Sequence, residues 1–162
     1  MPSRNVLMFL AAAVAVVVAA VVAVDPLADK AGGNALQPND AKVLAVGKTV
    51  YQAQCASCHG ARLEGQPNWR ERDAKGVLPA PPHDETGHTW HHPDDVLFRI
   101  TKYGVAKAAN LKNYASAMPI YEGVLSDKEI IAVLSWIKAQ WPAQIREKHD
   151  QMNAQAQPAG QP

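Results

Sequence analysis

The 162-residue sequence has only two cysteines, Cys55 and Cys58, and therefore no second Cys-x-x-Cys pair. Structural zinc sites usually take four protein ligands from two such pairs, or from one pair and two histidines, so a zinc site is disfavoured. The chain also lacks an excess of charge, because 16 basic residues stand against 15 acidic ones and the formal net charge is +1. Nucleic-acid binding needs a strongly basic surface, and the composition argues against it.

Strand-like alternation and internal repeats are missing as well. A thioredoxin-like dithiol expects a strand before its cysteine pair, and this sequence shows none. An ordinary disulfide between residues three apart is possible but would close a very small loop. The apolar residues instead recur at helical spacing, which predicts an all-α fold with long loops.

One long hydrophobic run is present, from Val6 to Val24, without a charged residue. A helix of this length would nearly cross a hydrocarbon core of about 30 Å. The run is longer than the apolar region of a signal peptide and lacks a clear cleavage site, so residues 1–24 are predicted to be an uncleaved anchor rather than a cleaved signal. Arg4 favours a cytoplasmic N-terminus. We therefore expect a single-pass inner-membrane protein with its domain on the periplasmic side, or alternatively a soluble periplasmic protein.

The remaining chain divides into three parts. Residues 25–38 contain Gly, Asn and Pro without an apolar period, which is typical of a flexible linker. Residues 39–142 form the predicted domain. Residues 143–162 are rich in Gln, Ala and Pro and are expected to be a polar, partly disordered tail, which could begin as a short helix.

Three helices are expected within the domain. The first begins at Asn39 or Asp40 and continues to the cysteine pair, the second lies within residues 92–104, and the third lies within residues 126–142, where Ser126 and Glu129 form a capping box. Residues 60–92 are mostly loop. A loop of this length in a small domain is usually functional or wrapped around a bound group.

The segment "CASCH", residues 55–59, joins the cysteine pair to a histidine. In a c-type haem site, two cysteines spaced in this way form thioethers with the porphyrin and the histidine that follows binds the iron. The sequence therefore predicts one covalently bound haem c, attached through Cys55 and Cys58, with His59 as an axial iron ligand.

Met118 is the candidate for the second axial ligand, because the other three methionines lie in residues 1–24 or in the tail. The Met-Pro sequence at 118–119 could hold the thioether sulfur rigidly, and His/Met ligation is a common arrangement. The loop histidines His83, His88, His91 and His92 leave two alternatives open, a bis-histidine iron and a second metal site such as one for copper.

The stretches "GKTVYQAQCASCHG", "APPH", "MPIY" and "LSDKEIIAVLSWIK" together resemble a class I cytochrome c over residues 39–141. The resemblance implies a cytochrome c-like fold in which the first and last helices cross near the haem. Gly47 and Tyr51 would then meet Val133 and Trp136. It also implies that a proline carbonyl in the loop after the motif, best matched by Pro81 and next by Pro82, accepts a hydrogen bond from the proximal histidine.

A six-coordinate iron leaves no place for a substrate, so we expect an electron-transfer protein rather than an enzyme. Its predicted partners are redox proteins, for example a respiratory complex or a terminal oxidase, reached from the membrane through residues 6–24. A haem-bearing subunit of a larger oxidase or dehydrogenase, or less favourably a ligand-binding or peroxidase-like protein, are the alternatives. The segment from Val96 to Tyr121 has four basic residues and no acidic one, which indicates either a docking face or a solvated surface.

Overall fold

The computed structural model describes residues 33–156, and the regular elements within this range are all helical, which confirms the all-α prediction. In chain order they are α2 (Ala41–Val50), η1 (Tyr51–Cys55), α3 (Ala56–His59), η2 (Thr89–His91), α4 (Asp94–Tyr103), α5 (Val105–Ala108), α6 (Asp127–Gln140) and α7 (Ala143–Ala156). Of these, η1 is a π-helical turn and η2 a 3₁₀ turn.

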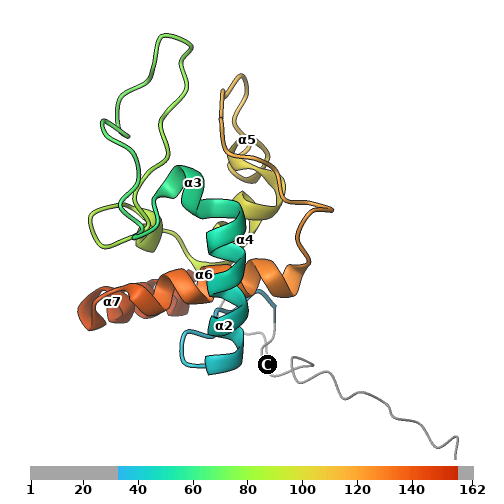
Figure 1. Cartoon of the computed structure of the whole chain (residues 1–162), viewed down its shortest axis with the longest axis vertical. Coiled ribbons are helices and arrows are strands. Elements are labelled where there is room, and N and C mark those ends of the chain that lie inside the picture. The colour runs from blue at the N-terminus through green and yellow to red at the C-terminus, as the bar shows by residue number, and fades with distance from the viewer. Residues whose placement is uncertain (1–32, 157–162) are drawn as a thin grey trace, which may run out of the picture.

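The crossing of α2 and α6 organises the fold (Figure 1). Local signals start both helices. The Asp40 side chain accepts hydrogen bonds from two backbone N–H groups at the start of α2, and the predicted capping box of Ser126 and Glu129 is present at α6. The helices approach closely at Gly47, where a Cβ atom would lie 2.8 Å from the Cβ of Trp136. Only glycine permits this approach.

The hydrophobic core lies between these two helices and α4. Its buried side chains come from all three elements and from the segments next to them: Val50, Tyr51, Leu63, Leu97, Phe98, Ile130, Val133, Leu134, Ile137 and Trp141. The ring centroids of Tyr51 and Trp136 are 4.7 Å apart. Cys55 and Ala56 pack against this cluster, so the core borders the Cys-x-x-Cys-His motif.

Two long loops extend from this helical core toward the same end of the molecule in Figure 1, one on each side of α3. The first covers residues 60–88 and the second residues 109–126. Glycines and prolines are frequent in the first loop, which explains why it forms no long helix. The two loops are the elements placed to surround a group attached at α3.

Residues 143–156, at the start of the expected partly disordered tail, form the 14-residue helix α7. His149 on α7 is completely buried, and the side chain of Lys138 on α6 forms an ion pair with Asp150. A helix at the start of the tail agrees with the expectation, and it is held by specific polar contacts rather than by a continuous apolar face.

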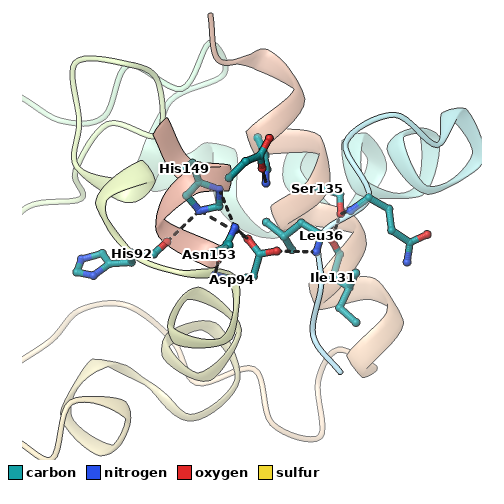
Figure 2. A network of polar contacts seen from close by, with 10 residues as sticks. Leu36, His92, Asp94, Ile131, Ser135, His149 and Asn153 are labelled. Atoms are coloured by element: carbon teal, nitrogen blue, oxygen red, sulfur yellow. Dashed lines mark hydrogen bonds and ion pairs between the residues drawn. The ribbon is translucent and has the colours of Figure 1, made fainter. Parts of the chain in front are cut away.

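Residues 34–37, at the end of the expected linker, are also joined to the domain. The Leu36 N–H donates to Asp94 at 2.9 Å, and the Gln37 N–H donates to the Ser135 hydroxyl at 2.9 Å, as Figure 2 shows. These bonds connect the start of the described chain to α4 and α6.

The predicted inner-membrane localisation requires a correction. Among residues 33–156, no helix combines the length and the apolar character needed to cross a bilayer. The apolar run from Val6 to Val24, on which the prediction depended, lies outside the described residues. Single-pass anchoring is thus not supported by the structure.

Candidate functional site

The Cys-x-x-Cys-His motif follows a change in helix type. The chain passes from α2 into the π-turn η1 and then into the single turn α3, and this irregular geometry widens the helix immediately before the motif. Gly60 ends α3 with a φ of 84°, and its carbonyl accepts a hydrogen bond from the Tyr51 hydroxyl at 2.8 Å. Tyr51, the buried first residue of η1, therefore fixes the residue that directly follows the motif.

Cys55 and Cys58 are free thiols, the first half-buried and the second exposed. Burial, with a smaller contribution from Cys58, raises the pKa of the Cys55 thiol to about 11. Redox-active dithiols instead depend on a cysteine with a lowered pKa. The pair consequently does not suit the chemistry of a disulfide oxidoreductase.

His59 is buried at the end of the motif and is oriented by Pro81. Its Nδ1 lies 2.8 Å from the carbonyl oxygen of Pro81, which can only accept, so Nδ1 carries the proton. Burial lowers the pKa of His59, although the bond to Pro81 opposes this effect. The neutral ring then has an unprotonated Nε2, which is the form that binds a metal.

The Pro81 carbonyl is itself held in place by close backbone packing. A Cβ atom on Gly65 would lie 2.7 Å from the carbonyl carbon of Pro81, and the N–H of Gln66 donates to Ala80 at 2.9 Å. The two sides of the 60–88 loop thus touch where the carbonyl meets His59. Cys55, Cys58, His59 and Pro81 form one constellation.

His83 lies beside His59 on this same constellation. The two imidazole rings are stacked, with their centroids 3.9 Å apart and an angle of 23° between their planes. Trans ligands of one iron must approach it from opposite faces, whereas these two rings lie face to face. The geometry therefore argues against a bis-histidine iron formed by His59 and His83.

The other loop histidines contact aromatic rings. His88 stacks on Trp69 with centroids 5.3 Å apart, and His91 stacks on Trp90 at 3.7 Å. Burial lowers the pKa of His88 and of His92. Within residues 33–156, no group of three or more His, Cys, Asp or Glu side chains is arranged to bind a metal ion, so a second metal site gains no support.

Met118 lies in the second long loop, in the wall of a cavity of about 290 Å³. Tyr103, Lys107 and Tyr114 also line this cavity. Three residues further on, the Tyr121 hydroxyl donates to the carbonyl of Gln54 at 2.8 Å. This bond ties the loop of Met118 to the turn that carries Cys55, although Met118 belongs to a separate part of the chain from the His59 constellation.

The basic segment between Val96 and Tyr121 is largely neutralised by residues just outside it. Three of its four cations form ion pairs: Arg99 with Asp95 at 2.9 Å, Lys102 with Asp127 at 2.6 Å and Lys107 with Glu122 at 3.8 Å. This pairing favours the interpretation as an ordinary solvated surface over that of a cationic docking face.

Trp141 and His149 were not predicted as site residues, but they help to hold the backbone of His83 in place. The indole N–H of Trp141 donates to the carbonyl of His83 at 2.7 Å, and His149 packs edge-on against the Trp141 ring at 5.0 Å. A tryptophan at the end of an apolar helix needs a partner for its N–H, and this was the available signal for Trp141. No comparable signal in the sequence indicates a role for His149.

A protein-family model described as "Cytochrome c" matches residues 44–141. Comparisons with curated proteins and with solved structures give no significant match. The matched range begins within α2, ends after α6, and includes the complete constellation and Met118. The two free thiols and the unprotonated Nε2 of His59 fit the attachment of a c-type haem.

Proposed function

The chain belongs to the cytochrome c family, whose members bind covalently attached haem c and transfer electrons, and we propose on this premise that His59 and Met118 are its two axial iron ligands. Cys55 and Cys58 would hold the group through thioether bonds. When bound, the haem iron exchanges one electron between its ferric and ferrous states. The observation that carries the proposal is the bond from His59 Nδ1 to Pro81, which leaves Nε2 unprotonated and able to bind a metal.

The chain's own residues would have three tasks at this site. Pro81 holds the plane and the tautomer of His59. Met118 would supply a thioether sulfur, which favours the ferrous state and would leave no coordination position for a substrate. The two long loops would exclude water from the bound group. This combination suits a carrier of single electrons between redox proteins better than a catalyst.

Optical spectroscopy of the haem-loaded protein tests the ligand assignment. The ferric wild type should show the weak long-wavelength absorption band that accompanies sulfur ligation, and Met118→Ala should lose it. Met152→Ala provides a matched control, because Met152 lies on α7 and not in the cavity wall. The control should keep the band.

The opposite outcome is equally informative. If the wild type lacks the band and its ferrous form binds carbon monoxide readily, Met118 is not a firm ligand. The iron would then have an accessible sixth position, as in ligand-binding or peroxidase-like haem proteins, and the electron-carrier proposal would be abandoned.

A further inference from the structure

The stacked pair of His59 and His83 is not required by the Cys-x-x-Cys-His motif or by the bond to Pro81. The ring of His83 covers one face of the His59 ring at a centroid distance of 3.9 Å. A hydrogen bond at Nδ1 fixes one point of the His59 ring, but the ring can still rock about that point. A flat neighbour in van der Waals contact restricts this remaining motion.

His83 can act in this way because it is itself fixed at three points. Its Nδ1 lies 2.8 Å from the Thr89 hydroxyl. Its backbone N–H donates to Leu63 at 2.8 Å, and its backbone carbonyl accepts from the Trp141 indole at 2.7 Å. The ring therefore presents a rigid surface to His59 rather than a mobile side chain.

Helix α7 holds in place Trp141, which donates to the His83 carbonyl. His149 packs against Trp141, and its Nε2 donates to the carbonyl of His92 at 2.9 Å (Figure 2). Asn153 accepts from the Asp94 N–H at 2.8 Å and donates to the Asp94 carboxylate at 2.9 Å. These bonds join α7 to both ends of the segment 92–94, which follows directly on the turn that contains Thr89.

We propose that His83 is a positioning residue, which fixes the orientation of the His59 imidazole by stacking on it and is held for this purpose by Thr89 and Trp141. This inference rests on the proposed role of His59 as an iron ligand. The orientation of an axial imidazole influences the electronic structure of a low-spin ferric haem. Looser positioning should therefore appear as a spread of electronic environments.

Electron paramagnetic resonance of the ferric holoprotein measures this spread directly. His83→Ala removes the stacking surface, so its low-spin signals should be shifted in g value and broader than those of the wild type. His83→Phe restores a flat ring without the bond to Thr89, and its signals should return most of the way to the wild type. Thr89→Val keeps the His83 ring but releases it, and an intermediate broadening is expected.

His91→Ala is the matched control, because His91 is an exposed histidine of the adjoining turn η2 that stacks on Trp90 rather than on His59. Its signals should equal those of the wild type. If folded His83→Ala gives wild-type g values and line widths, the positioning role is wrong. If His83→Ala does not retain haem, the variants His83→Phe and Thr89→Val provide the test instead. The proposal is then overturned if Thr89→Val gives wild-type signals while His83→Phe gives altered ones.

The same measurements separate this inference from the proposed function. A wild type that is not low-spin, or that lacks the sulfur-ligation band, contradicts the His59 and Met118 assignment whatever the variants do. A normal low-spin wild type with an unaffected His83→Ala variant contradicts only the role of His83.

Discussion

At the scale of single residues, Tyr51 connects the hydrophobic core to the motif. Its side chain is completely buried and its hydroxyl donates to the Gly60 carbonyl at 2.8 Å. Tyr51→Phe removes this bond and leaves the ring in place. We expect the variant to lose about 1 kcal/mol of unfolding free energy near neutral pH, as measured by urea denaturation of the holoprotein. Tyr114→Phe, in the second loop, should change little.

The same variant should also alter the response to alkaline pH. Burial raises the pKa of Tyr51 above its usual value of 10.0. The unfolded chain therefore loses the tyrosine proton first, and the contribution of Tyr51 to stability, complete below about pH 10, falls as the pH rises further. Tyr51→Phe should show a smaller alkaline loss of stability than the wild type. An identical loss would show that Tyr51 ionises equally easily in both states.

How far single residues of the site were predictable depends on how local their signal is. Cys55, Cys58 and His59 belong to one recognisable motif of five consecutive residues. The contact of Pro81 with His59 spans 22 positions and came only from the family resemblance. The stacking of His83 on His59 could not be predicted, because it depends on the path of a loop whose conformation is set by Leu63, Thr89 and Trp141 together.

At the scale of helices, the crossing of α2 and α6 depends on the absence of a side chain at Gly47. A Cβ atom there would lie 2.6 Å from the Ala132 carbonyl carbon and 2.8 Å from the Trp136 Cβ, neither of which is a flexible side-chain end. Gly47→Ala should therefore destabilise the holoprotein by about 1–3 kcal/mol despite alanine's better helix propensity. Urea denaturation measures this cost.

Lys48→Ala is the appropriate comparison, because Lys48 is exposed on the same helix. It should unfold at nearly the same urea concentration as the wild type. A Gly47→Ala variant as stable as Lys48→Ala would mean that the two helices can separate without loss.

Helix α7 should make the stability sensitive to mild acid. Burial lowers the pKa of His149 below its usual value of 6.5, and nearby Lys138 acts in the same direction, although Asp94, Asp150 and the bond to His92 oppose this. Below about pH 6.5 the unfolded chain binds the proton more readily, so the stability contributed by neutral His149 decreases as the pH falls.

His149→Gln tests this dependence, because glutamine can still donate to the His92 carbonyl but does not titrate. Its unfolding free energy should change less steeply with pH between about pH 7 and pH 5 than that of the wild type, by at most about 1.4 kcal/mol per pH unit. Parallel curves would contradict the role of His149. The contacts of this helix were not predictable, because its partners Asp94 and His92 lie 57–59 positions earlier in the chain.

At the scale of the whole molecule, the helices and the two long loops are held in place by different kinds of interaction. The α2–α6 crossing and α4 bury a shared apolar core and begin at local signals, and these are the parts that the sequence predicted well. The 60–88 and 109–126 loops have few buried apolar residues of their own. Their conformation follows from contacts between distant segments, such as the bond from Tyr121 to Gln54.

Loss of the haem should therefore affect these two parts of the molecule unequally. In a Cys55→Ala/Cys58→Ala variant that cannot attach haem, amide hydrogen exchange should accelerate most in the 60–88 and 109–126 loops, because their apolar lining would lose its partner. Amides of α6 and α7 should accelerate less, since they pack through residues such as Ile130 and His149 that lie in the helical core. If exchange accelerates equally in loops and helices, the haem supports the fold as a whole and the core between α2 and α6 is not sufficient to hold these helices together.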